Sequence, residues 1–180
     1  LKKDEDLKSF FQDKYKELID SCHSKGIAVI MDFVFNHAYG QSPLVKMYWD
    51  ASANQPSSDN PWFNQNCPHP PYCWGYDFNH LSSATQNFMD RVNTYWIEEY
   101  NIDGIRFDFT KGFTNNSNSG WDVQRQDLLK RMADTIWSIK PDFDVILEHW
   151  GDNNEEKILS NYGMLLWGNT TYNYRESAMG

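Results

Sequence analysis

Hydrophobic residues follow two spacings along this chain, and together these spacings predict alternating helices and strands. In the first stretch they recur every three or four residues, as on one face of a helix: Leu7, Phe10, Phe11, Tyr15, Leu18, Ile19 and Cys22. We expect Asp4 or Asp6 to cap this helix and Gly26 to end it. Residues 27–34 are apolar almost throughout, which predicts a strand buried on both faces of a parallel sheet.

The same alternation returns in the second half of the chain. Helices are predicted after an N-cap at Ser82 or Ser83, over 128–137 ahead of Pro141, and over 155–159. Strands are predicted over residues 102–109, 143–147 and 164–167. Strands that alternate with helices are typical of an α/β fold built on a parallel sheet.

Between the two halves the periodicity disappears, and Pro, Ser, Asn and Gln dominate. A structureless loop of this length is unusual inside a compact domain, so it predicts an inserted subdomain or the wall of a site. We expect most of its aromatic side chains to form the insertion's own core and one or two to face a cleft. The expected organisation is therefore 1–37, an insertion over 38–76, and 77–180.

Charged residues stand where each predicted strand ends. Asp32 closes the first strand, Arg106 and Asp108 lie in the second, and Glu148 follows the third. The carboxyl ends of parallel strands meet at one edge of the sheet, where ligands are bound, and neighbouring strands lie about 4.8 Å apart. The spacing along the chain therefore predicts that Asp108 and Glu148 face each other.

The neighbours of these two carboxylates predict different protonation states. Arg106 and Lys111 are expected to keep Asp108 ionised, whereas Glu148 beside Trp150 is expected to have a raised pKa. One carboxylate that attacks and one that donates a proton are what the retaining cleavage of a glycosidic bond needs. The competing interpretation is a structural ion pair at a strand end.

Several short motifs resemble those of the alpha-amylase family, glycoside hydrolase family 13, in the family's order. They are residues 32–37, residues 75–79, residues 104–108 with Lys111, and Glu148 with Trp150. The resemblance implies a partial (β/α)8 TIM barrel, about strands 3 to 6, with an inserted irregular domain B. It covers essentially the whole chain but only about the middle half of such a catalytic domain.

The resemblance also implies a role for each matching residue. Asp108 would be the nucleophile, Glu148 the general acid and base, and Arg106 the residue that orients Asp108. The implied substrate-binding residues are His37, Asp32, Lys111 and Trp150. In calcium-binding members of the family, the positions of Asn36 and Asp77 contribute to a calcium site, and oxygen ligands suit that ion. Gly112 departs from the family, because many amylases have His there.

Composition favours a neutral substrate. The net charge of −9 argues against nucleic acid or an anionic membrane as partner, and the 8 Trp are among the residues on which sugar rings stack. No apolar run approaches the length of a membrane span. Cys67 and Cys73 are candidates for a local disulfide, which would suit a secreted or periplasmic protein acting on α-glucan. A structural calcium is the one cofactor expected.

The family's fourth motif, which supplies a third carboxylate, does not occur in these residues, and the chain starts without Met, so it reads as an excerpt. Two open strand edges are expected, which a second copy in a homodimer or segments supplied elsewhere would pair. One alternative function is a glucan-binding or structural fragment without catalysis. Another is a metal-dependent hydrolase, with ligands drawn from Asp32, His37, Asp77, His80 and Asp108.

Overall fold

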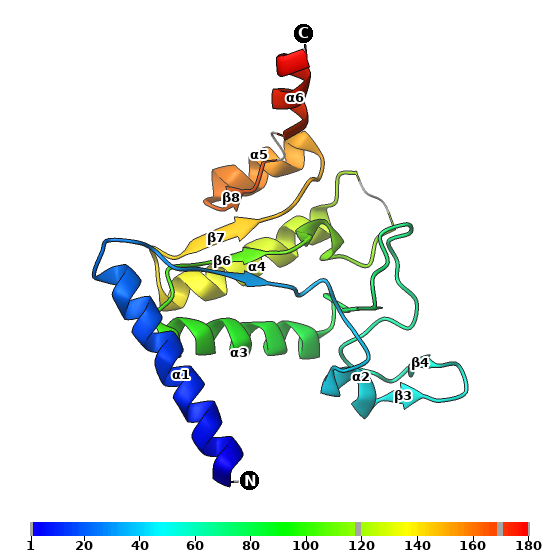
Figure 1. The fold of residues 1–180 in the computed structure, drawn as a ribbon. Helices are drawn as coiled ribbons and strands as arrows, with labels where there is room; N and C mark the ends of the chain where they lie inside the picture. Colours follow the sequence, from blue (N-terminus) through cyan, green and yellow to red (C-terminus); the bar gives the residue numbers. More distant parts are fainter. Residues whose placement is uncertain (1, 118–119, 169–170, 180) are drawn as a thin grey trace.

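The computed structural model describes residues 2–117, 120–168 and 171–179, and its centre is one parallel sheet (Figure 1). The sheet has the order β1-β6-β7-β8, formed by β1 (Ile30–Phe33), β6 (Gly104–Phe107), β7 (Asp144–Leu147) and β8 (Leu165–Leu166). Every neighbouring pair is parallel, and Asp32 is in register with Arg106. The predicted α/β fold and its four strands are confirmed.

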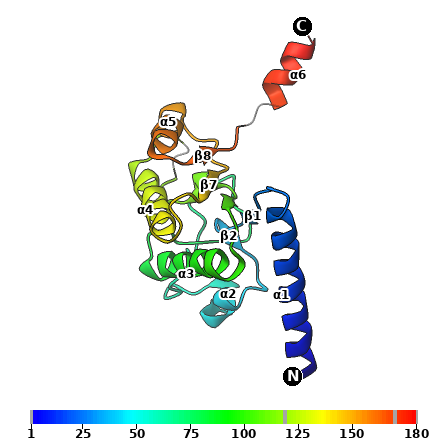
Figure 2. The ribbon, with the colours of Figure 1, turned by 90° about the vertical axis from the view of Figure 1, so that its left-hand side faces the viewer.

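Three helices, α3 (Ser83–Tyr100), α4 (Val123–Ile139) and α5 (Asn153–Tyr162), cover one face of this sheet (Figure 2). Each begins at a side-chain cap: the side chains of Ser82, Asp122 and Asp152 accept hydrogen bonds from backbone N–H groups of the first turn. The predicted N-cap at Ser82 is confirmed. The core between helices and sheet includes Ile97, Ile105, Phe107, Leu129, Ile136, Val145, Leu147 and Leu159.

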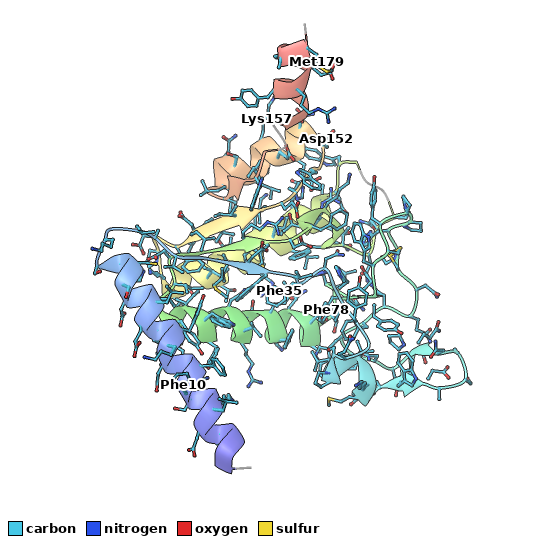
Figure 3. The ribbon with its side chains drawn as sticks, in the orientation of Figure 1. Phe10, Phe35, Phe78, Asp152, Lys157 and Met179 are labelled. Carbon is cyan, nitrogen blue, oxygen red and sulfur yellow. A yellow bond between two sulfur atoms is a disulfide. The ribbon has the colours of Figure 1, made fainter. Side chains whose placement is uncertain are left out.

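The first helix, α1 (Lys2–His23), differs from the prediction in two ways. It starts before Asp4, so Asp4 and Asp6 lie within the helix and do not cap it. The apolar residues of its first half are exposed, Phe10 by 53%, and Figure 3 shows that Phe10 lies on the part of α1 that extends beyond the sheet. The second half packs on the sheet through the buried Ile19 and the Tyr15 hydroxyl, which donates to the Met31 sulfur.

The strand prediction for residues 27–34 was correct in place but wrong in burial. Among its residues Ile27 is 56% exposed, Ile30 39% and Val34 50%. The physical reason is position, because β1 is an outer strand of this sheet and hydrogen-bonds only β6 within the described residues. One face and one edge of the strand are therefore open.

The insertion lies beyond the carboxyl ends of the strands (Figure 1). Its short elements are β2 (His37–Ala38), α2 (Pro43–Met47), β3 (Trp49–Asp50), β4 (Gln55–Pro56) and β5 (Tyr76–Asp77). β2 pairs with β5, and β3 with β4. A second cluster of Val45, Phe63 and Phe78 forms around them, and Figure 3 places Phe78 beside Phe35 at the edge of the main core.

The remaining features are the cysteines, a short turn after β6 and the last helix. The predicted disulfide between Cys67 and Cys73 is present, and Cys22 is a free, half-buried cysteine. A 3₁₀ turn, η1 (Thr110–Gly112), follows β6, and α6 (Thr171–Met179) stands away from the sheet (Figure 1). Within the described residues, no helix is both long and apolar enough to cross a membrane.

Candidate active site

One arginine side chain contacts three carboxylates at the carboxyl ends of β1, β6 and β7. Arg106 Nη1 donates to Asp32 Oδ1 at 2.8 Å and to Asp108 Oδ1 at 3.1 Å, while Nη2 contacts Glu148 Oε2. Parallel pairing produces this meeting, because Arg106 is in register with Asp32 and adjacent strand ends bring residues 108 and 148 side by side. The predicted proximity of Asp108 to Glu148 is confirmed.

Backbone hydrogen bonds extend the sheet past the strands and fix these residues. The Asp108 amide donates to Phe33 O at 2.8 Å, and the Glu148 amide to Phe107 O at 3.0 Å. Phe109 then turns with φ +43°, and its amide donates to Glu148 Oε2 at 3.2 Å. The carboxylate of Glu148 is thus held by a backbone donor as well as by a cation.

Exposure falls steadily across the three carboxylates. The side chain of Asp32 is 62% exposed, that of Asp108 28%, and that of Glu148 13%. Burial raises the pKa of Glu148, the neighbouring Asp108 raises it further, and the Phe109 amide and Arg106 oppose the rise. The predicted direction is confirmed, but the cause is burial and Asp108; Trp150 is 46% exposed.

His37 lies close to this cluster, against an aromatic wall. The charge of Asp108 raises its pKa, but burial has the larger effect and lowers it. Its ring centre lies 6.1 Å from that of Trp74, and Trp74 meets Phe109 edge-on at 5.0 Å. We predicted that one or two aromatics of the insertion would face the site, and Trp74 does, while others, such as Trp49 and Trp62, pack in the insertion.

Lys111 points to a different place from the one predicted. Its Nζ lies 6.0 Å from the ring centre of Tyr72, beside a hollow of about 240 Å³ that is also lined by His69 and Phe109. Arg106 is the cation in hydrogen-bond contact with Asp108. A larger hollow, about 630 Å³, lies over α3 and away from the carboxylates, so size alone does not locate the chemistry.

Trp167, which sequence reasoning missed, belongs to the same cluster. It follows β8, its amide donates to Leu147 O, and its ring centre lies 4.6 Å from the guanidinium carbon of Arg106. Such a cation–π contact restrains the flat face of the guanidinium. The available signal was an aromatic residue at the end of the strand next to β7.

A separate cradle of oxygen atoms lies where β2 and β5 pair. Asn36 Oδ1 is buried without a hydrogen-bond partner among the described residues, and a Cβ at position 112 would lie 1.8 Å from it. Asp77 is buried and accepts one bond, from Asn64 Nδ2 at 2.8 Å; burial raises its pKa to about 7. The other nearby group is the buried imidazole of His69, whose Nε2 lies 3.7 Å from Asp77 Oδ1 and whose pKa is lowered by burial. A hard cation fits these oxygens, because it would satisfy the orphaned amide oxygen and neutralise the Asp77 carboxylate, which a neutral imidazole does not.

The described residues do not support the alternative of a metal-dependent hydrolase. Over residues 2–117, 120–168 and 171–179 there is no group of three His, Cys, Asp or Glu residues that could hold a metal ion. His80 is buried instead, with its ring stacked on Phe113 at 4.1 Å, and burial lowers its pKa to about 3. The five proposed ligands do not converge.

Comparisons with known proteins relate part of this chain to alpha-amylases. Residues 11–82 match the family model for the alpha amylase catalytic domain. The maltogenic alpha-amylase of Bacillus acidopullulyticus is 29% identical over 150 residues, which cover 77% of this chain and 23% of that enzyme. This chain therefore spans less than a quarter of the length of that relative.

Solved structures show the same fold. Amy13B of Eubacterium rectale superposes with a TM-score of 0.69 at 23% identity, over 87% of this chain and 34% of that one. Pullulanase type I of Bacillus subtilis, solved with maltose, superposes with a TM-score of 0.51 at 26% identity, over 76% and 17%. The open four-stranded sheet is thus part of a TIM barrel, as predicted.

Proposed function

Because this chain is related over part of its length to the alpha-amylase family, we propose that it carries the paired catalytic carboxylates of a retaining α-glucan hydrolase. The observation that carries the proposal is the hydrogen-bonded cluster of Arg106 with Asp32, Asp108 and Glu148. The substrate class is α-1,4-linked glucan, such as starch and maltooligosaccharides. Maltose in the related pullulanase structure supports this choice.

In this mechanism Asp108 is the nucleophile. Its carboxylate attacks the anomeric carbon, the glycosidic C–O bond breaks, and a glycosyl ester forms on Asp108. Arg106 Nη1 occupies Asp108 Oδ1, so that the other oxygen is left to attack. Glu148 gives its proton to the leaving oxygen and then takes one from the water that hydrolyses the ester. Its raised pKa supports that role.

The remaining residues bind the sugar in this proposal. His37 contacts the ring at the cleavage subsite, supported by Trp74 and near Asp108. Asp32 is the most exposed of the three carboxylates and is free on its outer side to accept from sugar hydroxyls. Lys111, over Tyr72, and the exposed Trp150 bind further glucose units.

Reducing-sugar release from soluble starch by the full natural protein tests the function, and Asp108→Asn should abolish it. A slow fluorinated maltosyl fluoride should label the wild type with one glycosyl ester, which peptide mass spectrometry would locate at Asp108. Measurable glucan binding with no turnover would instead favour the binding-only alternative.

We also propose a structural calcium held by Asn36 and Asp77. It would neutralise Asp77 and fix the insertion to the sheet, and no catalytic step passes through it. Above about pH 7, where Asp77 loses its proton, calcium should raise the melting temperature relative to EDTA. Asp77→Asn should remove that difference, whereas an equal response in wild type and variant would exclude the site.

Two further proposals concern the setting of the protein. The Cys67–Cys73 disulfide and a polymeric substrate support a secreted or periplasmic location. The exposed Ile30 on β1 and Leu165 on β8 support pairing of these outer strands, with a second copy or with other strands of the barrel. Sedimentation that shows a stable monomer would count against the homodimer.

A further inference from the structure

A second arginine, Arg125, is buried completely behind the catalytic cluster. It lies in the first turn of α4 with its side chain 0% exposed, and it binds Glu155 of α5, which is also 0% exposed. The pair is bidentate: Nε donates to Oε1 at 2.6 Å, and Nη2 to Oε2 at 2.8 Å. A buried ion pair adds little stability compared with apolar side chains of the same size, so its presence indicates a role other than stability.

The other donors of Arg125 reach the loop after β6. Nη1 donates to Lys111 O at 3.1 Å, and Nη2 to Gly120 O at 2.8 Å. Glu155 Oε2 in turn accepts from the Asp122 amide at the start of α4, at 2.8 Å. The pair therefore joins the loop that follows Asp108 to the helix that follows Glu148.

From Glu155 the hydrogen bonds continue to the proposed acid. Glu155 Oε1 lies 3.0 Å from His149 Nε2, and His149 Nδ1 lies 3.0 Å from Thr110 Oγ1. A proton on Nε2 satisfies the first contact and leaves Nδ1 to accept from the Thr110 hydroxyl. The Thr110 amide donates to Glu148 O at 2.9 Å, which completes the path from Arg125 to Glu148.

The imidazole has little freedom to leave this path. His149 is 1% exposed, and a Cβ at position 151 would lie 2.7 Å from its Cδ2 and Nε2, so the backbone of Gly151 closes over the ring. Burial opposes ionisation of Glu155, but hydrogen bonds from His149 and Arg125 bring its pKa to about 2. The carboxylate is thus a permanent acceptor for His149 over the working pH range.

We infer that Arg125, Glu155 and His149 are positioning residues that, through Thr110, hold Glu148 in place to protonate the leaving group. The inference rests on the proposed function and deepens it, because it adds residues that do not touch the substrate. Glu148, with a side chain 13% exposed at the end of a strand, needs such support, since a small misplacement of a general acid costs much of its effect.

The chain offers a matched control. Arg131 is also on α4, and it also makes a bidentate pair with a carboxylate of a neighbouring helix, Asp90 of α3, at 2.8 and 3.1 Å. That pair has no hydrogen-bond path to Glu148 among the described residues. Glu155→Gln and Asp90→Asn therefore make the same chemical change to two bidentate pairs, of which only one leads to the acid. The pairs differ in burial, because the side chains of Arg131 and Asp90 are 36% and 21% exposed, so a second variant at the path itself is also needed.

The test compares two substrates in the full natural protein. A maltooligosaccharide needs a proton on its leaving oxygen, whereas α-maltosyl fluoride has a leaving group that departs without one. For Glu155→Gln we expect kcat on the oligosaccharide to fall about tenfold or more with KM within about twofold. Single-turnover fluoride release should change less than about threefold, and Asp90→Asn should change neither rate.

Thr110→Val serves as the second variant, because it breaks the path near Glu148 without exposing a buried charge. It should show the same loss on the oligosaccharide only, and it decides the question if Glu155→Gln does not fold. Equal losses on both substrates, or a Glu155→Gln enzyme that behaves as Asp90→Asn does, would overturn the inference. A wild type without glucan turnover would instead refute the proposed function.

Discussion

Arg106 and Arg125 bind carboxylates at similar distances, yet their surroundings are opposite. Arg106 faces Asp32, Asp108 and Glu148 at an open strand edge, and its Nε has no hydrogen-bond partner among the described residues. Arg125 is sealed between α4 and α5, and the donors on its three nitrogens bind Glu155 and two backbone carbonyls. In both clusters carboxylates outnumber the cation, since Asp122 Oδ2 also lies 4.0 Å from Arg125 Nη1. The difference is that the first cluster is open to solvent, whereas the second is enclosed by its partners.

This difference shows how to separate chemistry from support in an unfamiliar fold. Carboxylates that share one cation and remain exposed on one side can still meet a substrate. Carboxylates whose oxygen atoms are all occupied inside the protein can act only through other residues. Changes at Arg106 should therefore remove activity while the fold survives, and changes at Arg125 should act first on stability.

The largest expected effect follows from Asp108→Asn, which removes the attacking oxygen but keeps the size of the side chain. We expect kcat/KM on maltooligosaccharides to fall about 10⁴-fold or more. Asp144→Asn, at the opposite end of the sheet, is the control and should keep nearly full activity. Residual activity in Asp108→Asn near the wild-type level would assign the nucleophile elsewhere.

The next effect is on folding, and it comes from Arg125→Met. The change leaves Glu155 buried without its cation, so the free energy of unfolding should fall by about 3–5 kcal/mol. The double variant Arg125→Met with Glu155→Leu removes both charges and should recover much of that loss. Urea unfolding followed by circular dichroism measures both, and a double variant as unstable as the single one would contradict the account of the pair.

Arg106→Lys tests whether the open cluster serves activity or stability. A lysine keeps the charge but cannot bridge three carboxylates or stack under Trp167, so we expect kcat to fall about 100-fold. The free energy of unfolding should change by less than about 1 kcal/mol, because lysine keeps the positive charge and the side chains of Asp32 and Asp108 are partly solvated. A large loss of stability with unchanged kcat would mean that the cluster is a structural ion pair.

Much of the open cluster could be predicted from the sequence, because its residues end strands that the hydrophobic pattern locates. Parallel pairing then fixes which ends meet, and Asp108 and Glu148 follow. The exposure of α1 and β1 could not be predicted in this way, since periodicity shows which face is apolar but not what covers it. Trp167 was missed because an uncharged aromatic residue at a strand end does not by itself indicate a functional site.

Arg125 and Glu155 were also missed, although the sequence holds a signal. Arg125 lies four residues before Leu129, and Glu155 four before Leu159, so each charged residue stands on the apolar stripe of its helix. A charge on such a stripe indicates a buried partner. Arg125 and Glu155 are 30 residues apart in the sequence, so their meeting depends on how their two helices dock on the sheet, and no local pattern contains that information.

The smallest expected effect is a pH dependence that again separates the two clusters. The pKa of Glu155 is about 2 in the folded protein, below the ordinary 4.5, so the unfolded chain takes up a proton first as the pH falls. The stability that Glu155 contributes is complete above about pH 5 and declines as the pH falls towards 2, with a loss of about 1 kcal/mol by pH 4.

Glu155→Gln should flatten this part of the stability curve, as measured by urea unfolding between pH 6 and pH 3.5. Glu148→Gln at the open cluster should not flatten it, because the pKa of Glu148 is raised and its protonation does not favour the unfolded chain. If both variants kept the wild-type slope, the acid sensitivity would arise outside the sealed pair, and the contrast between the two arginines would be one of burial alone.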